Sequence, residues 1–499
     1  MVNQNQTPLL DAIISNAKRP HAAFYTPGHK QGKGISLKLT DYFGKSVFTA
    51  DLTELTELDC LFAPDGVIQQ AQQLAAEAFG SWQTWFLVNG STCGIEAVIM
   101  ATCCDGDKII LPRNVHSSVI SGLILSGAIP IFINPEYDTN LGIAHGISIE
   151  SLETALQKHA DAKAVMMVYP TYYGVCGDIR AIAQLTHEYN IPLIVDEAHG
   201  AHFAFHPKFP ISALAAGADL TVQSIHKTLG AMTQASMLHL QGERININRL
   251  NKSLQLTQST SPSYLLLASL DAARQQIALN GEKLLTRTLQ LAQEARNQIS
   301  KIPQLSILSL SPSSLSLDKT RLTVIVSQLG ITGFEAEEIL DEKFNVTPEF
   351  ACLKTVTFII SLGNTKEDIE QLIKAFTELA KQYRKPLLAI EKGLENNQKA
   401  ATIKLVSQAL AGNQSLVLSP RQAFFAATET LPIKETINRT SAETVCPYPP
   451  GIPLLIPGEI ITSTVVEHLL KVKAMGGFIS NCADTSLCTL KVVADGHGA

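Results

Sequence analysis

The stretch ADLTVQSIHKTLGAMTQASML, residues 218–238, is the most informative part of this chain for its fold. It begins with a short apolar run at Leu220–Val222, becomes polar at Ser224, and places His226 and Lys227 side by side before a series of small residues. Strands of parallel sheets are continuously apolar because helices cover both of their faces. The stretch therefore predicts a buried strand that ends in a polar, cationic turn.

Similar apolar runs recur through residues 60–265 and alternate with helix-like segments. One such segment, GVIQQAQQLAAEAFG (66–80), ends on glycine, as helices commonly do. The alternation predicts an α/β fold with a mostly parallel sheet that has helices on both faces. The predicted strands are Lys108–Leu111, Ile129–Ile133, Ala164–Val168, Pro192–Val195, Leu220–Val222 and Met237–Leu240.

The pattern changes after residue 265. A helix predicted at Gly281–Ile302 is followed by strand, helix, strand and helix patterns at 321–326, 333–344, 355–363 and 366–383, which indicates a smaller α/β domain. The last hundred residues form another compact piece around CPYPPGIPLLIPGE (446–459). We therefore expect an N-terminal segment (1–50), a large domain (51–265), a small α/β domain (266–384) and a C-terminal α+β domain (385–499).

Composition excludes several classes of protein. A formal charge of −6 and a pI near 6.1 argue against a nucleic-acid partner. The N-terminus lacks the pattern of a secretory signal, and no apolar run is long enough to predict a membrane span. Nine scattered cysteines, an odd number without metal-ligand spacing, favour reduced thiols in the cytoplasm and no metal site.

Three segments of the large domain carry residues suited to chemistry. The segment VNGSTCGIEAVI (88–99) places Gly90, Ser91 and Thr92 before an apolar helix, where backbone N–H groups, hydroxyls and the helix dipole suit a phosphate group. A Ser or Thr in this position is also a common helix N-cap, and this interpretation stays open for the segment alone.

The second segment, PLIVDEAHGAHF (192–203), ends a buried strand on Asp196. A buried carboxylate needs a cation, and a protonated pyridine nitrogen is one; His199 could position a ring or a substrate carboxylate. The alternative is that Asp196 caps the next helix. In the third segment, Lys227 beside His226 suits Schiff-base formation, and Ser224 and His226 could share the phosphate, although a lone lysine after a strand is usually a surface residue.

The letters DEAH also occur in a helicase motif. A helicase needs an upstream Gly-x4-Gly-Lys-[Ser/Thr] loop, and the candidate GKS at 44–46 has Leu39 in place of the first glycine. We therefore reject that interpretation.

Taken together, the segments resemble those of the fold-type-I pyridoxal-phosphate (PLP) enzymes, and among these the Orn/Lys/Arg decarboxylase family. The resemblance extends over nearly the whole chain. It includes YTPGHKQGKG near the start, DLTELTELDCLFAPDGVI (51–68), YPTYYGVCGDI (169–179) and PYPPGIPLLIPGE (447–459), and the SxHK and PYPPGIPxxxPGE elements are its specific parts. The chain looks like the short biosynthetic type.

The resemblance implies roles for named residues. Lys227 would hold PLP through a Schiff base, Asp196 would pair with the pyridinium nitrogen, and His199 would lie near the Schiff base or the substrate carboxylate. His116, in RNVHSS, would stack on one face of the ring and Ala198 would pack on the other. The phosphate ligands would be Ser91, Thr92, Ser224 and His226, following Gly90. The family also implies a homodimer with shared active sites.

A basic substrate requires an acidic group, and the candidates are Glu443 and Glu459; Glu459 could instead cap the helix that follows. Arginine is the first choice of substrate, giving agmatine for polyamine synthesis, with lysine or ornithine as alternatives. Another fold-type-I reaction stays open, since an aminotransferase or aldolase could use a late arginine (Arg321, Arg384, Arg421 or Arg439). So does a catalytically silent homologue that regulates an active decarboxylase.

Overall fold

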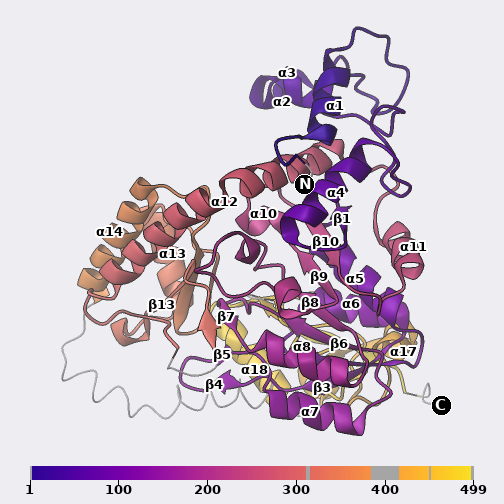
Figure 1. Cartoon of the computed structure of the whole chain (residues 1–499). Helices are drawn as coiled ribbons and strands as arrows, with labels where there is room; N and C mark the ends of the chain where they lie inside the picture. The colour runs from indigo at the N-terminus through magenta and orange to yellow at the C-terminus, as the bar shows by residue number, and fades with distance from the viewer. Residues whose placement is uncertain (1–2, 311–314, 384–414, 449–450, 496–499) are drawn as a thin grey trace. The chain divides into compact units, whose positions relative to one another are not determined.

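The computed structural model describes residues 3–310, 315–383, 415–448 and 451–495 (Figure 1). The chain forms two compact units, and each combines separate segments of the sequence. The first unit is Met1–Thr102 with Pro192–Thr286, and the second is Cys103–Ile191 with Arg287–Ala499. The domain boundaries expected from the sequence remain predictions. Within the described ranges, every helix is too short or too polar to cross a bilayer.

Four strands of the main sheet belong to the first unit. Their order is β1 (Gln83–Leu87), β10 (Ser236–Leu240), β9 (Leu220–Gln223) and β8 (Leu193–Asp196). Strands β8 and β9 are parallel, whereas β10 runs antiparallel to both of its neighbours. Because β8 and β9 are parallel, their carboxyl ends lie side by side, with Asp196 in register with Val222.

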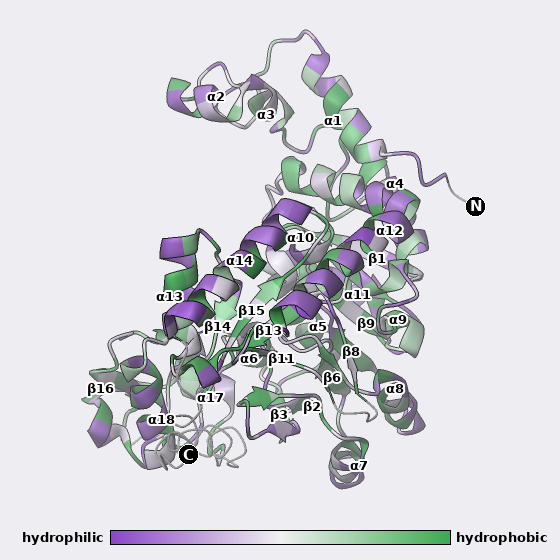
Figure 2. Ribbon diagram, turned by 90° about the vertical axis from the view of Figure 1, so that its left-hand side faces the viewer, coloured by the Kyte–Doolittle hydropathy of each residue, from purple (hydrophilic) through white to green (hydrophobic). Residues whose placement is uncertain are grey.

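Three further strands of the main sheet belong to the second unit, in the order β6 (Ala164–Val168), β2 (Lys108–Pro112) and β3 (Ile129–Ile133). Both pairs are parallel. The expected α/β fold is confirmed, and each of the six predicted strands agrees with the structure to within one residue at either end. The predominance of apolar residues in these strands is visible as green arrows in Figure 2. The edge strand β1 and the antiparallel direction of β10 were not predicted.

Two helices of the first unit lie next to its strands in the sequence or in space. Helix α4 ends at Phe79, and Gly80 adopts the left-handed conformation, as the sequence predicts. Helix α5 lies close against the sheet: a Cβ added at Gly94 would come within 2.9 Å of Val222 Cγ1 on β9. Between residues 60 and 260, the helices of this unit are α4 (Val67–Phe79), α5 (Gly90–Thr102), α9 (Ala213–Ala216), α10 (Ile225–Thr228) and α11 (Ile247–Thr257), with a 3-10 turn at Phe203–Phe205.

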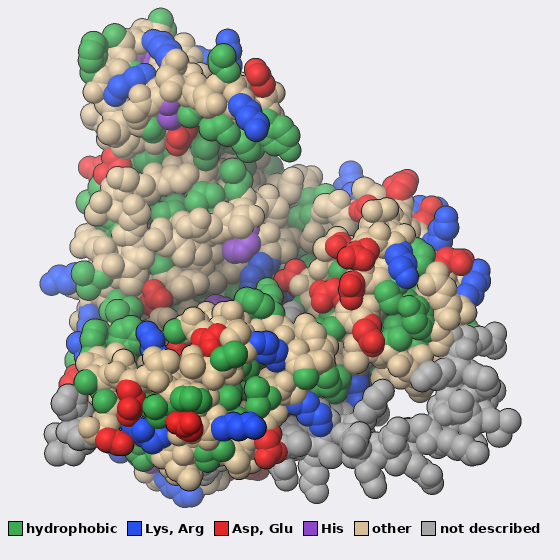
Figure 3. Space-filling model, turned by 180° about the vertical axis from the view of Figure 1, so that it is seen from behind, with side chains coloured by type: hydrophobic (Ala, Val, Ile, Leu, Met, Phe, Trp, Pro, Cys, Tyr) green, Lys and Arg blue, Asp and Glu red, His purple; other side chains and the backbone are tan. Residues whose placement is uncertain are grey.

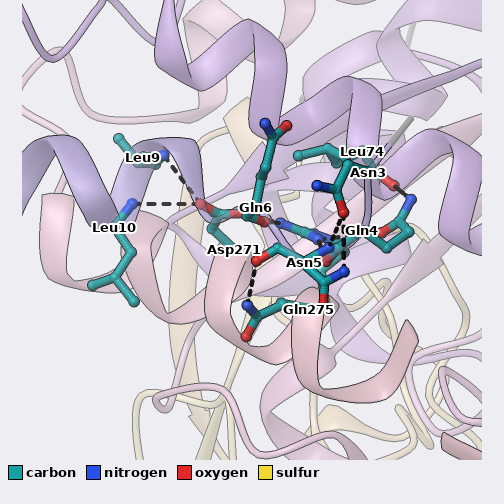
Figure 4. Close-up of polar contacts among 10 residues, drawn as sticks. Asn3, Gln4, Asn5, Gln6, Leu9, Leu10, Leu74, Asp271 and Gln275 are labelled. Atoms are coloured by element: carbon teal, nitrogen blue, oxygen red, sulfur yellow. Dashed lines mark hydrogen bonds and ion pairs between the residues drawn. The ribbon is translucent and has the colours of Figure 1, made fainter. Parts of the chain in front are cut away.

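Hydrogen bonds join the N-terminal segment to residues 271–275 (Figure 4). It forms α1 (Pro8–Lys18), α2 (Leu37–Phe43) and α3 (Lys45–Ala50). The carboxylate of Asp271 accepts hydrogen bonds from the backbone N–H groups of Leu9 and Leu10, at 3.1 and 3.4 Å, and thereby satisfies the start of α1. Arg274 lies 2.5 Å from the same carboxylate, and both side chains are fully buried. Arg274 also donates to the carbonyls of Gln4 and Gln6.

The long helix α12 (Tyr264–Ile299) carries Asp271 and passes from the first unit into the second. It starts well before the predicted Gly281. The helix continues through Gly281, and this glycine lies against another segment: a Cβ there would stand 3.1 Å from Phe205 Cβ. The glycine therefore marks close packing and not a helix boundary.

After α12, the second unit forms a four-stranded antiparallel sheet in the order β11-β13-β15-β14. Apolar side chains of this sheet, of α13 and of α14 share one buried cluster. Figure 2 shows the opposite, polar side of α14 in purple. The bounds are β11 (Ser306–Ile307), β13 (Arg321–Ile325), α13 (Gly333–Phe344), β14 (Phe350–Ala351), β15 (Thr355–Ile359) and α14 (Lys366–Tyr383).

The C-terminal part of the second unit has its own core, centred on side chains such as Val445, Leu455 and Leu469. Two antiparallel strand pairs, β16 with β19 and β17 with β18, accompany two helices. The bounds are α17 (Pro420–Phe425), β16 (Thr428–Pro432), β17 (Cys446–Tyr448), α18 (Ser463–Ala474), β18 (Phe478–Ser480) and β19 (Thr489–Val493). Elsewhere in this unit lie α6 (Ser117–Ser126), α7 (Ile149–Lys158), α8 (Ile179–Glu188), and the short strands β4 (Tyr137–Asp138), β5 (Ile143–Ala144), β7 (Val175–Cys176) and β12 (Ser316–Leu317).

Candidate active site

Lys227 lies on α10, the single helical turn that follows β9. Its Nζ is 3.0 Å from Nε2 of His199, which lies on the turn after β8 and is buried. The two side chains meet because β8 and β9 are parallel neighbours, so that the turns at their carboxyl ends are adjacent. A lysine amine and an imidazole nitrogen at this distance can exchange a proton.

Asp196 is the last residue of β8 and is 7% exposed. Its Oδ1 accepts a hydrogen bond from the backbone N–H of Ala198 at 3.1 Å, which fixes the turn that leads to His199. The helical turn that follows, Phe203–Phe205, begins after His202, so the alternative in which Asp196 caps the next helix is wrong.

The Gly-Ser-Thr turn predicted to hold a phosphate meets the end of β9. Ser224 Oγ donates to Ser91 Oγ at 3.0 Å. Gly90 has a φ of 77°, which favours glycine, and begins α5, so that the helix N-terminus and the hydroxyls of Ser91 and Thr92 belong to one turn. A helix N-terminus with several hydroxyl groups is a suitable site for an anion.

His226 is half-buried and its orientation is fixed by one main-chain group. Its Nδ1 lies 3.0 Å from the carbonyl oxygen of Ala235, and its backbone N–H donates to the same carbonyl. Because a carbonyl oxygen only accepts, Nδ1 carries a proton in this contact. The residues predicted to bind the cofactor that lie in the first unit are therefore gathered around the ends of β8 and β9 and the start of α5.

His116 belongs to the second unit, where it precedes α6. Its ring accepts a hydrogen bond from the N–H of Ser118 at 3.2 Å and therefore caps this helix. Nδ1 is also 2.9 Å from Ser118 Oγ. The stacking role of His116 remains a prediction.

Glu459 forms a buried ion pair that the sequence analysis did not foresee. Its Oε2 lies 3.1 Å from Nη2 of Arg113, and neither side chain is more than 5% exposed. The same guanidinium donates to the carbonyls of Pro453 and Leu454, at 2.6 and 3.0 Å. Burial raises the pKa of Glu459, while Arg113 opposes this shift. Helix α18 is capped by Thr462, so the alternative in which Glu459 caps it is wrong.

Glu443 is also engaged within the C-terminal part. Its two oxygens accept hydrogen bonds from the backbone N–H groups of Ala483 and Lys491, both at 2.8 Å. The substrate-binding roles of Glu443 and Glu459 remain predictions. Pro449 and Pro450 of the PYPPGIPLLIPGE element lie outside the described residues.

Three of the four late arginines can be located, and Arg384 lies outside the described residues. Arg321 is buried on β13, and burial lowers its pKa, with Asp318 opposing the shift. Arg421 donates to the carbonyls of Ile124 and Leu125, and Arg439 pairs with Glu429 and Asp495.

The sequence motifs did not predict the environment of Glu197. This residue is fully buried, and it accepts hydrogen bonds from the N–H of Ala213 and from Gln223 Nε2, both at 2.8 Å. Burial raises its pKa to about 8, while the two hydrogen bonds oppose this shift. The signal available in the sequence was a second acidic residue directly after Asp196 at the end of an apolar strand.

A cavity of about 370 Å³ lies in the first unit, away from the predicted site residues, none of which lines it. Amide and aromatic side chains form its wall, among them Gln72, Trp82, Trp85, Asn251 and Gln258.

Comparison with known proteins assigns the chain to a family. A model of the Orn/Lys/Arg decarboxylase major domain matches residues 7–316, and a model of the C-terminal domain of the same enzymes matches residues 400–478. An arginine decarboxylase of Bacillus subtilis is 39% identical over 498 residues, which is 99% of each chain. An arginine decarboxylase of Halalkalibacterium halodurans is 40% identical over 499 residues, again 99% of each.

The chain belongs to the Orn/Lys/Arg decarboxylase family. A constitutive lysine decarboxylase of Escherichia coli is more distant, at 24% identity over 94% of this chain and 78% of that protein. The fold is also that of solved lysine decarboxylases: the enzyme LdcF of Francisella novicida has a TM-score of 0.85 at 23% identity, covering 98% of this chain and 81% of the other. Membership of this decarboxylase family confirms the fold-type-I assignment.

Proposed function

We propose that the chain is a PLP-dependent arginine decarboxylase that forms agmatine and CO2. The observation that carries the proposal is the contact between Lys227 Nζ and His199 Nε2, next to the strand-end carboxylate of Asp196. The choice of arginine is supported by identities of 39–40% with arginine decarboxylases over nearly the whole chain, against 24% with lysine decarboxylases.

The residues present fit PLP. Lys227 would hold the cofactor covalently, and Asp196 would pair with its ring nitrogen. The turn at Ser91 and Thr92, with Ser224, would hold the phosphate, and the hydrogen bond between Ser224 and Ser91 supports this assignment. His226 is proposed as a further phosphate ligand and Ala198 as a packing surface for the ring. When bound, PLP supplies an electron-poor ring that takes up the charge left at Cα as CO2 departs.

Side chains of the protein itself are placed to transfer protons in the proposed site. Lys227 must lose a proton before its amine can act as a nucleophile, and His199 Nε2, at 3.0 Å, is placed to receive it. The same imidazole can return the proton to Nζ later in the cycle. Asp196, nearly removed from water, retains a negative charge best when a cation lies opposite it.

The test is a product assay with PLP and arginine, lysine and ornithine in parallel, scoring CO2 and the released amine. We expect agmatine to dominate. Replacement of Lys227 (Lys227→Ala) should abolish both the product and the visible absorbance band of the bound cofactor. The control Lys366→Ala, on the exposed face of α14, should keep both. Inactivity of the wild type on all three amino acids would refute the proposal, and a preference for lysine or ornithine would reassign the substrate.

We further propose that the enzyme is a homodimer of polyamine synthesis in the cytoplasm. The N-terminal segment exposes large apolar side chains, with Phe24 91% and Tyr42 84% accessible, and Figure 3 shows green side chains gathered on this part of the surface. Such surfaces mark contacts with other chains. Light scattering should give twice the chain mass, and polar substitution of Phe24 and Tyr42 should lower it. Cysteines without a disulfide among the described residues support the cytoplasm.

A further inference from the structure

A chain of buried polar side chains crosses the four strands of the first unit. Glu197 Oε2 accepts from Gln223 Nε2 at 2.8 Å, and Gln223 Oε1 lies 3.2 Å from His239 Nε2. His239 Nδ1 lies 2.7 Å from Thr84 Oγ1, which lies 2.9 Å from the hydroxyl of Ser81. The chain thus passes from β8 through β9 and β10 to β1, and ends at the partly exposed Ser81.

These polar groups occupy one face of the sheet, and α5 covers the other. Thr84 is directly opposite His239, and alternation along β9 places Gln223 on the face away from Val222, the residue that touches α5. Ser224, which follows Gln223, is hydrogen-bonded to Ser91 on α5. The hydrogen-bonded side chains therefore lie on one face of the strands. The proposed cofactor ligands lie at the ends of the same strands, on the face that α5 covers.

The two strand ends are joined directly by this chain. Glu197 follows Asp196, and its backbone N–H donates to the carbonyl of Val222 at 2.9 Å, which extends the pairing of β8 with β9. The side chains of Glu197 and Gln223 add a second connection between the same two strands, one residue before Ser224. A shift of either strand end would break both connections.

We propose that Glu197 and Gln223 are positioning residues, which fix Asp196 and Ser224 relative to each other through this buried chain. The proposal rests on the proposed function, since it concerns the ligands assigned there to PLP. Glu197 and Gln223 are not required to touch the cofactor. Glu197 acts through Asp196, which precedes it, and Gln223 acts through Ser224, which follows it.

The direction of the hydrogen bonds follows from the donors. When Glu197 is ionised, Gln223 donates its N–H to the carboxylate, so the Gln223 oxygen must accept from His239, whose Nε2 therefore carries the proton. His239 Nδ1 then accepts from the hydroxyl of Thr84. Burial lowers the pKa of His239 to about 3, which keeps the ring neutral, as this arrangement requires. Its ring stacks on Phe79 with centroids 4.6 Å apart.

Replacing the carboxyl group of Glu197 with an amide would reverse the direction of each hydrogen bond in the series without breaking any of them. In Glu197→Gln, the new N–H₂ group donates to a rotated Gln223, which donates to His239 Nε2, and His239 moves its proton to Nδ1 and donates to Thr84. Every contact is kept. In Gln223→Leu, by contrast, the carboxyl group of Glu197 and the ring of His239 both lose their shared partner in a buried site.

The experiment measures the PLP dissociation constant of the purified, cofactor-free protein by titration, together with kcat and KM for arginine. We expect Gln223→Leu to raise the dissociation constant about 10- to 100-fold, the range known for removing side chains that orient the ligands of metal ions. Its kcat should fall more than its KM rises. Glu197→Gln should remain near the wild type, whereas Glu197→Leu should resemble Gln223→Leu.

Thr221→Val is the matched control. Thr221 is buried on the same face of β9, and its hydroxyl has no hydrogen-bond partner, so removing it should leave the dissociation constant unchanged. A folded Gln223→Leu protein with the wild-type constant would overturn the proposal, as would an equal loss in Thr221→Val.

A second measurement needs no cofactor. At a pH above 8, where Glu197 is ionised, the nitrogen chemical shifts of ¹⁵N-labelled His239 should show the proton on Nε2 in the wild type and on Nδ1 in Glu197→Gln. The same His239 tautomer in both proteins would contradict the inferred series of hydrogen bonds. If the wild type fails to bind PLP, the proposed function fails, and the His239 tautomers still decide whether the chain exists as described.

Discussion

A carboxyl group that is removed from water holds its proton more tightly, and Glu197 is in this position. Its pKa is raised to about 8 by burial. The unfolded chain releases this proton near the ordinary glutamate value, about 4.3. Between these two pH values the folded protein binds more protons than the unfolded one, so the stabilising contribution of the protonated group is complete below pH 4 and is lost as pH rises toward 8.

We therefore expect the free energy of unfolding to fall between pH 5 and pH 8 by an amount that Glu197→Gln removes. The amide cannot ionise, so the variant should show a flatter pH dependence in this interval. Urea unfolding at several pH values measures the difference. Parallel curves for the two proteins would show that Glu197 does not titrate in this range.

The close approach of α5 to the sheet sets a limit on the size of residue 94. We expect Gly94→Val to lower the free energy of unfolding by about 1–3 kcal/mol, the usual cost of overpacking a buried site. It should also weaken PLP binding, because α5 carries Ser91 at its N-terminus.

Chemical denaturation and cofactor titration measure the two effects of Gly94→Val. Gly28→Val is the control, since a Cβ at Gly28 meets no atom within 4 Å. An equally stable Gly94→Val protein would show that α5 can move away from β9 without cost.

The sequence predicted residues whose chemistry depends on their place in a motif. Lys227, Asp196 and Ser91 were predicted because a lysine, an acid and a hydroxyl turn each follow a recognisable strand or precede a helix. Glu197 was not, because its partner Gln223 is separated from it in the sequence and only the pairing of β8 with β9 brings them together. The ion pair of Arg113 and Glu459 was not predicted either, because its two residues are 346 positions apart in the sequence.

At the scale of elements, the Arg113–Glu459 pair holds the loop before α6 to the segment before α18. We expect Glu459→Ala to lower the free energy of unfolding by about 3–5 kcal/mol, because it leaves the buried guanidinium without its counter-charge. Glu459→Gln should cost less, since it keeps the shape and part of the hydrogen bonding.

Thermal and urea unfolding measure these effects. The exposed pair between Lys366 and Glu370 on α14 provides the control, and Glu370→Ala should leave the unfolding midpoint almost unchanged. A wild-type midpoint in Glu459→Ala would mean that the Pro453 and Leu454 carbonyls alone satisfy Arg113.

Element positions were predictable where hydrophobic periodicity and local end signals determine them. Helices α13 and α14 begin and end as expected because their ends carry clear signals, such as the capping box of Thr332 and Glu335. The start of α12 was not predictable, because Gly281 looks like a boundary until its contact with Phe205 is known. Strand direction was also beyond the pattern: β10 is as apolar as its neighbours but runs the opposite way.

At the scale of the whole molecule, the N-terminal segment depends on a residue far along the chain. We expect Asp271→Ala to lower the free energy of unfolding by about 3–5 kcal/mol, since Arg274 is left buried without its carboxylate and the first N–H groups of α1 lose their acceptor. Limited proteolysis should then cut first within residues 3–18.

Asp271→Asn is the informative comparison, because the amide oxygen can still accept from Leu9 while the charge is lost. An intermediate stability would apportion the effect between the ion pair and the helix cap. Resistance of Asp271→Ala to proteolysis at the N-terminus would show that other contacts hold this segment in place.

The same attachment has a consequence during synthesis. Leu9 is made 262 residues before its acceptor Asp271. At translation rates of about 5–20 residues per second, the interval is about 13–50 s. For this time the emerging N-terminal segment, which exposes Phe24 and Tyr42, lacks the carboxylate that binds the start of α1. It is therefore the part of the polypeptide that ribosome-associated chaperones would be expected to engage first.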